Sequence, residues 1–236
     1  MTNEGIIGKL KWFYDKWFEV MLRPIYFFTV MKEESWQDDS LSFLLASAWI
    51  SAFFASIMLF IVSYVPIGQY MIAGIAGFKF LVILPVLCVL AFNFFMITFL
   101  IMGGMMVCGF FVAQAICALF IHSVASLWQG KGELNRMLQS MFYSNAAFMT
   151  VNLVFILMLV VKFAGLGFPM FKVGYNLIYF LTLLFVYGLW SIIIRKNYDL
   201  PKWKSFIIAL IPILVLLLFG LVFDKIALSK FEPWVS

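Results

Sequence analysis

The feature that most constrains this chain is a stretch of about fifty residues, Lys79 to Trp128, whose opening lysine is its only acidic or basic side chain. The core of a lipid bilayer offers no water, so a backbone that crosses it must satisfy its own amide groups as a helix. Three more long apolar runs follow this stretch, and one precedes it. Only 11% of the residues are charged, and the mean hydropathy is +1.08. The sequence therefore predicts an all-α, polytopic membrane helical bundle.

Four of the apolar runs have the length of a single membrane crossing. A helix rises about 1.5 Å per residue and the hydrocarbon layer is about 30 Å thick, so about twenty residues suffice for one span. The four predicted spans are Leu41–Tyr64, Met141–Val161, Gly174–Ile194 and Ser205–Phe223. The central run is too long for one crossing of this kind, and it contains no polar turn.

The placement of lysine and arginine decides how the central run is interpreted. If Met105–Trp128 crosses and Lys79–Met102 does not, eleven basic residues lie on one side of the membrane and five on the other. Two crossings would make six spans and reduce the split to nine against seven. Basic residues concentrate in cytoplasmic loops, so the sequence favours five spans, a cytoplasmic amino terminus and an external carboxyl terminus. The segment Lys79–Met102, interrupted by Pro85 and Asn93, is then expected to be a re-entrant or shallow helix.

Residues 1–39 differ from the rest of the chain because charged and aromatic side chains alternate there. Wound as a helix, this segment places Lys9, Lys11, Asp15, Lys16 and Glu19 opposite an apolar face. That face consists of Ile6, Ile7, Leu10, Phe13, Tyr14, Trp17, Val20 and Met21. Such a helix lies in the headgroup plane of a membrane or packs against the bundle, and both can hold.

The pair Arg23-Pro24 is expected to end this amphipathic helix, because a residue before proline avoids the helical region. The chain is then expected to have three parts. They are an amphipathic cytoplasmic segment at 1–39, a transmembrane domain at 40–228 and a short carboxyl-terminal tail at 229–236.

Small residues recur at four-residue spacing in the first span and predict a close helix contact. Lipid provides no hydrophobic drive between helices, so stripes that let two backbones approach are what joins them. The predicted packing stripe consists of Ser47, Ser51 and Ala55 on one strip and Ala48, Ala52 and Ser56 on the next.

A second stripe, in the central run, is polar. Gln114, Ala118, His122 and Ser126 repeat every four residues, and a polar strip in lipid is expected to turn inward. The favoured interpretation is hydrogen bonding between helices, with Asn145, Asn152 or Thr150 of the next span as partner. The alternative is that the strip lines the path of a small transporter or channel subunit.

Patterns for catalysis, cofactors and metals are not found in this sequence. His122 is the only histidine, which excludes a site with several histidines, and no carboxylate lies in the central spans to assist it. Glu33-Glu34 is similar to the paired glutamates of intramembrane CAAX-type proteases, but the pair lies in a hydrophilic linker. We therefore expect no catalytic residue, cofactor or metal, and no enzyme. A net charge of +5 in a membrane protein reflects orientation and lipid headgroups, so a nucleic-acid partner is not expected.

Several short motifs resemble the Yip family, membrane proteins named for their interaction with Ypt/Rab GTPases. The similar segments are Leu22–Phe28 before the first span, Phe120–Arg136 with its histidine and Gly-Lys-Gly loop, Met141–Ala147, Tyr175–Leu181 and Pro201–Ser205. The sequence departs from the family at Gln129, where the first loop glycine is usual, and at Ala147, where proline is frequent.

The resemblance implies five spans and a cytoplasmic amino terminus, and the short tail resembles the bacterial branch of the family. It implies a non-enzymatic scaffold, adaptor or membrane-organising protein in a bacterial inner membrane. The expected partners are the lipid bilayer and either another protein or a second copy of the chain.

Overall fold

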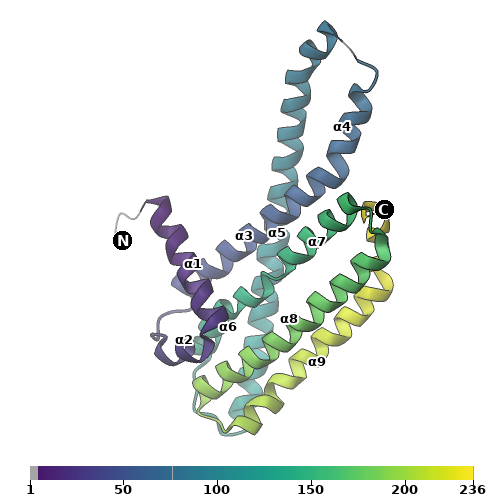
Figure 1. The fold of residues 1–236 in the computed structure, drawn as a ribbon. Coiled ribbons are helices and arrows are strands. Elements are labelled where there is room, and N and C mark those ends of the chain that lie inside the picture. The colour runs from purple at the N-terminus through teal and green to yellow at the C-terminus, as the bar shows by residue number, and fades with distance from the viewer. Residues whose placement is uncertain (1–4, 76, 236) are drawn as a thin grey trace.

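The computed structural model describes residues 5–75 and 77–235 and, within them, contains helices and no strand (Figure 1). The predictions for residues 1–4, for Ser236 and for the side chain of Ile6 lie outside the described part of the chain. The helices before the long central one are α1 (Ile6–Leu22), α2 (Pro24–Val30), α3 (Asp39–Leu59), the π-helical segment η1 (Phe60–Tyr64) and α4 (Val65–Ile72). The remaining ones are α5 (Phe78–Leu127), α6 (Leu134–Phe148), α7 (Val151–Ala164), α8 (Gly167–Tyr198), α9 (Lys202–Ile226), the 3-10 helix η2 (Leu228–Phe231) and α10 (Glu232–Val235).

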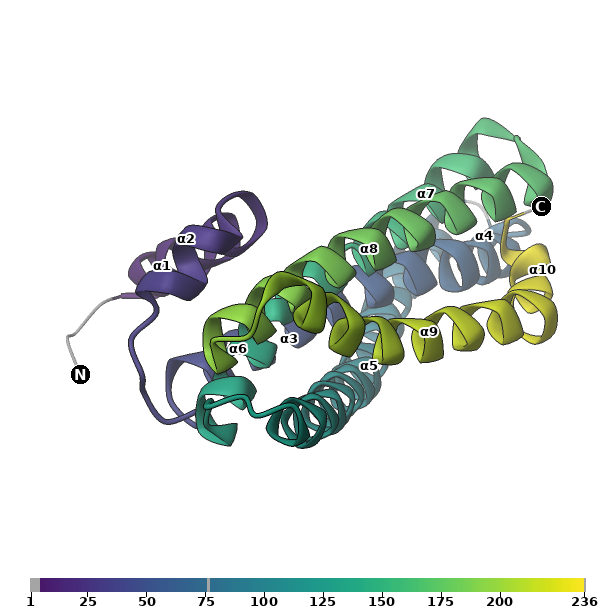
Figure 2. The ribbon, with the colours of Figure 1, turned by 90° about the horizontal axis from the view of Figure 1, so that it is seen from below.

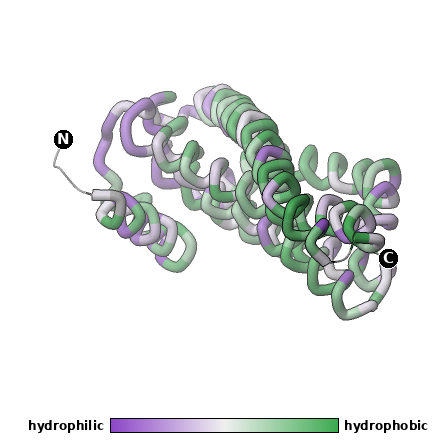
Figure 3. The backbone as a smooth tube through the Cα atoms, turned by 90° about the horizontal axis from the view of Figure 1, so that it is seen from above, coloured by the Kyte–Doolittle hydropathy of each residue, from purple (hydrophilic) through white to green (hydrophobic). Residues whose placement is uncertain are grey.

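Five of the described segments are long and apolar enough to cross a membrane, which confirms the predicted helical bundle and its multi-pass membrane character. The five candidate spans are Asp39–Ile72, Phe78–Leu127, Leu134–Ala164, Gly167–Tyr198 and Lys202–Ile226. In Figure 3 the hydrophilic colours gather around α1, α2 and the neighbouring loops, whereas the long helices are mostly hydrophobic.

The expectation for Lys79–Met102 was wrong. These residues are neither re-entrant nor separate, because α5 runs without a break for 50 residues. At about 1.5 Å per residue such a helix is about 75 Å long, more than twice the hydrocarbon thickness of about 30 Å. Pro85 lies early in α5 without ending it, and Gly103-Gly104 continue the helix. The backbone amides of this apolar run find hydrogen-bond partners only within a helix, so the helix continues.

The first half of α5 pairs with α3, η1 and α4 to form a helical hairpin that projects beyond the other helices (Figure 1). Aromatic rings join its two arms: the Tyr64 and Phe94 rings stack with centroids 4.3 Å apart, and the Trp49 and Phe99 centroids are 5.1 Å apart. The ring centroid of Phe95 lies 6.1 Å from the centroids of both Phe53 and Phe60. Large apolar side chains cover the outer surface of this hairpin.

The loops before α3, after α5 and after α8 meet at one end of the molecule. The Arg136 guanidinium forms a salt bridge with Glu33 across 2.6 Å, and the Lys131 amide donates to the Tyr198 carbonyl at 3.3 Å. The turn between α4 and α5 and the turn between α7 and α8 lie at the opposite ends of the spanning helices. Consecutive spans are thus antiparallel, and the loops that carry the larger basic group share one end.

The amino-terminal segment packs beside the bundle at this end (Figure 2). α1 ends at Leu22 and α2 starts at Pro24, which confirms the predicted break at Arg23. The predicted apolar face of α1 is divided in two. Val20 is buried, and the Phe13 ring stacks on Phe43 of α3 at 4.9 Å, whereas Ile7 is 84% exposed. Leu10 and Tyr14 are also exposed, so one half of the face contacts the bundle and the other points outward.

The carboxyl-terminal residues fold back onto the bundle and do not extend as a free tail. Leu228 of η2 and Val235 of α10 are buried with Met158 of α7 and Phe171 of α8 in a small core. The main core lies at the opposite end, near α2. It includes Phe28, Phe43, Ile121, Met141, Trp190 and Ile208, which belong to six different helices.

Candidate functional site

A buried polar cluster joins three of the spanning helices, α3, α5 and α6. The Asn145 amide of α6 donates to the Ser47 hydroxyl of α3 at 2.7 Å, and the Gln114 amide of α5 donates to the Asn145 oxygen at 3.5 Å. All three side chains are buried, with at most 3% exposed. In lipid an unpaired amide would be costly, so these bonds fix the register of the three helices. We refer to Gln114, Asn145 and Ser47 as the polar cluster.

The predicted polar strip does not remain on this packed face. Gln114 and Ala118 are buried, His122 is half-buried, and Ser126 is exposed. A four-residue step advances about 400° around a helix with 3.6 residues per turn, so each repeat drifts by about 40°. Over three repeats the strip leaves the contact with α6. The residues that stay buried there are Ala118, Ile121 and Ala125.

The partners predicted for this strip are brought together only in part. Asn145 belongs to the polar cluster, whereas the Asn152 side chain is buried in α7 and its Oδ1 atom accepts no hydrogen bond from the described residues. Thr150 contacts Thr182 of α8, with 2.9 Å between the two hydroxyl oxygens. The Gln114 Oε1 atom also has no partner in the described structure.

His122 forms its hydrogen bond with a residue that the sequence did not indicate. Its Nδ1 atom lies 2.7 Å from the hydroxyl of Tyr198, the last residue of α8, which is 1% exposed. The loop after α5 packs on the same residue. A Cβ atom at Gly130 would lie 2.9 Å from the Tyr198 Cβ, and one at Gly132 would overlap the Asn197 carbonyl oxygen. The glycines therefore permit a close approach of this loop to the end of α8.

Two further contacts between α6 and α8 were also missed. The Trp190 indole donates to the Ser144 hydroxyl at 3.2 Å, and the Asn197 amide donates to the Ser140 hydroxyl at 2.9 Å. All four residues are buried. Each pair is separated by more than forty residues in the chain, and nothing local in the sequence indicates such a pairing.

The six small residues of the predicted packing stripe in α3 are all buried in the bundle. They face α5, α6 and α7, the helices that α3 contacts. The buried set consists of Ser47, Ala48, Ser51, Ala52, Ala55 and Ser56. Opposite them, α5 contributes Gly103, where an added Cβ would overlap the indole ring of Trp49. Gly103 thus permits a close approach of α5 to Trp49 of α3.

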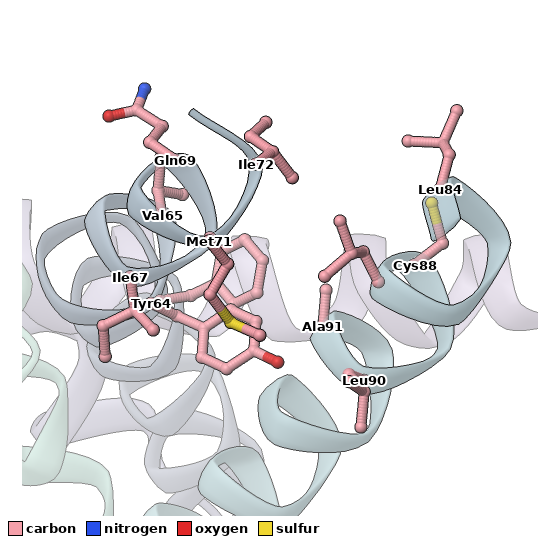
Figure 4. Close-up of a pocket in the computed structure, with 13 residues that line it drawn as sticks. Tyr64, Val65, Ile67, Gln69, Met71, Ile72, Leu84, Cys88, Leu90 and Ala91 are labelled. Carbon is pink, nitrogen blue, oxygen red and sulfur yellow. The ribbon is translucent and has the colours of Figure 1, made fainter. Parts of the chain in front are cut away.

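Four cavities of about 210–380 Å³ lie in the described part of the chain, and none of the four is lined by the polar cluster or by His122. The largest, about 380 Å³, lies between α4 and the first half of α5 (Figure 4). Leu84, Cys88 and Ala91 border it on the α5 side and Met71 on the α4 side, while the amide of Gln69 points away from α5. Its walls are mainly apolar and suit hydrocarbon.

Within residues 5–75 and 77–235, no three histidine, cysteine or acidic side chains are grouped so that they could hold a metal ion. Glu33, one of the two linker glutamates, is paired with Arg136. The polar groups inside the bundle are amides, hydroxyls, an indole and one imidazole, which are suited to hydrogen bonding between helices. In comparisons with known proteins, no family model, curated protein or solved structure matches this chain.

Proposed function

We propose that this membrane protein is a non-enzymatic scaffold or adaptor of the Yip type, which organises the membrane or a partner within it. The observation that carries the proposal is the packing of Gln114. This side chain, at the amino-terminal end of the polar strip, is bonded to Asn145 and buried against neighbouring helices. Side chains that line a solute path face a polar or wet space, whereas Gln114 joins two helices.

The loop after α5 supports the relationship with the Yip family. Gln129 stands where that family usually has its first loop glycine, and its φ is 65°. This is the left-handed region that glycine adopts most readily. Gly130 and Gly132 follow at positions where a side chain would collide with α8. The backbone of this loop thus has the conformation for which a glycine-rich motif is suited.

The proposed location is a bacterial inner membrane, with the amino terminus in the cytoplasm. The orientation rests on the eleven basic residues at the end that carries α1 against five at the other end, and the bacterial membrane rests on the resemblance to the bacterial branch of the family. Single cysteines at Lys131 and at Lys230, in a variant without the three native cysteines, test the orientation. We expect an impermeant thiol reagent to label position 230 in intact cells, and position 131 only after lysis. Labelling of both positions in intact cells would contradict the five-span arrangement.

A scaffold acts through partners, and we propose another membrane protein or a second copy of this chain. The projecting part of the hairpin, formed by α4 and the first half of α5, carries exposed large apolar side chains such as Tyr70, Phe78 and Phe92. Cross-linking in native membranes followed by a pull-down in mild detergent identifies the partner. Recovery of the chain alone and as a monomer would count against the scaffold proposal.

The decisive experiment separates a scaffold from the alternative, a small transporter or channel subunit. The purified protein is reconstituted into liposomes, and ion, proton and small-solute flux is measured between about pH 5 and 8, where histidine titrates. We expect no saturable flux, and we expect His122→Ala to reduce stability because it removes the bond to Tyr198. Saturable flux that His122→Ala abolishes would overturn the proposal.

A further inference from the structure

A cavity with charged walls lies where the amino-terminal segment meets the bundle. It has a volume of about 270 Å³ and is bordered by α1, α2, the linker before α3, the start of α3, and α6. Two lysines, Lys16 and Lys32, and three carboxylates, Glu19, Glu34 and Asp39, line it. None of these five side chains forms a salt bridge in the described structure. Charges of both signs therefore border one space without neutralising each other directly.

A buried amide in the wall of this cavity also lacks a partner. Gln139 of α6 is 2% exposed; its Nε2 atom donates to the Lys32 carbonyl at 3.0 Å, but its Oε1 atom accepts no hydrogen bond. This oxygen is enclosed by protein and is not open to the cavity, so the preference for a ligand follows from the charged side chains. Three carboxylates around the same space favour a donor that is positively charged.

The arrangement of charges favours a ligand that carries charges of both signs. The three carboxylates do not form a group that could hold a metal ion. Two lysines and three carboxylates on the same space offer partners to an anionic and a cationic group at once. A zwitterion with an ammonium and a phosphate satisfies both sets, because lysine ammonium groups bind phosphate well.

The position of the cavity indicates where such a zwitterion comes from. Asp39 begins the first span, and α1 carries an outward apolar strip with Ile7 and Leu10, so the cavity lies at the edge of the hydrocarbon. Phe27, Val30 and Met31 add apolar wall on the α2 side. We infer that this cavity binds the phosphate ester of a primary amine, a phosphoethanolamine group, as carried by phosphatidylethanolamine.

Binding to the purified, delipidated protein in a neutral detergent tests the inference. Phosphatidylethanolamine, phosphatidylcholine and phosphatidylglycerol with identical acyl chains are added separately. Native mass spectrometry measures the bound fraction, and thermal unfolding measures the stabilisation that binding to the folded state produces. We expect the ethanolamine lipid to bind about tenfold more tightly than the other two, since choline has no N–H donor and glycerol has no charge.

Variants assign the two ends of the ligand. Glu34→Gln and Asp39→Asn should remove the preference for ethanolamine over choline, and Lys16→Gln should weaken all three lipids. Asp15→Asn is the matched control for the carboxylates, because Asp15 lies exposed on α1 outside the cavity. Glu34 lies in an exposed linker, so its variant keeps the test valid if Asp39→Asn fails to fold.

Glycerophosphoethanolamine without acyl chains distinguishes a lipid from a free ester. Displacement of the lipid by this soluble compound would support the same recognition chemistry with a free ester as ligand. Failure to displace it, with tight binding of the lipid, would support a lipid as ligand. Equal binding of the three lipids, or an unchanged preference in Glu34→Gln, would overturn the inference.

Discussion

The contact between Gly103 of α5 and Trp49 of α3 allows a prediction with its own internal control. An alanine Cβ at Gly103 would overlap the Trp49 indole, whereas an alanine Cβ at the adjacent Gly104 would have no atom within 4 Å. Both substitutions add the same helix propensity, about 1 kcal/mol in favour of alanine. Overpacking costs about 1–3 kcal/mol and applies at Gly103 alone. We therefore expect Gly103→Ala to be about 1–3 kcal/mol less stable than Gly104→Ala.

The measurement is the free energy of unfolding in mixed micelles, followed by the loss of helical circular dichroism. A double-mutant cycle with Trp49→Leu completes the test, because removal of the indole should relieve the cost at Gly103. We expect the cycle to show a favourable coupling of about 1 kcal/mol or more. Equal free energies of unfolding for Gly103→Ala and Gly104→Ala would contradict this prediction, since the Trp49 ring would then move aside without destabilising the bundle.

Two further substitutions test the helix contacts of α3 and α6. Ser51→Leu should destabilise the bundle by about 1–3 kcal/mol because Ser51 is fully buried, whereas Ser42→Leu on the exposed side of α3 should not. Equal melting temperatures of the two variants in detergent would show that the stripe is not a packed contact. Asn145→Ala should cost about 1–3 kcal/mol, since it removes two bonds of the polar cluster. Asn93→Ala, at an exposed position of α5, should be neutral, and an equal loss in both variants would argue against the cluster.

Part of the candidate site could be predicted from residue types alone. Polar side chains inside long apolar runs must find partners in lipid, so the pairing of Gln114 with Asn145 of the next span was predictable. The fates of His122 and Ser126 were not, because a four-residue repeat does not follow the 3.6-residue turn of a helix. Tyr198, the partner of His122, is 76 residues away in the chain.

The central run shows the limit of charge counting. The count of basic residues led to five spans, and five suitable helices are present. It also led to a separate re-entrant segment at Lys79–Met102, which the continuous α5 contradicts. The positive-inside rule predicts only which loops lie on which side of the membrane. It does not predict the length of the helix between two loops.

Membrane-spanning helices follow from residue types alone, because uncharged runs of this length can satisfy their amides in lipid only in that way. The break between α1 and α2 follows as well, through the steric effect of Pro24 on the preceding Arg23. Tertiary packing, in contrast, divides the apolar face of α1 between the bundle and the outside. It alone also brought Lys16, Glu34 and Gln139 to one cavity, because contacts between distant segments depend on how whole helices pack.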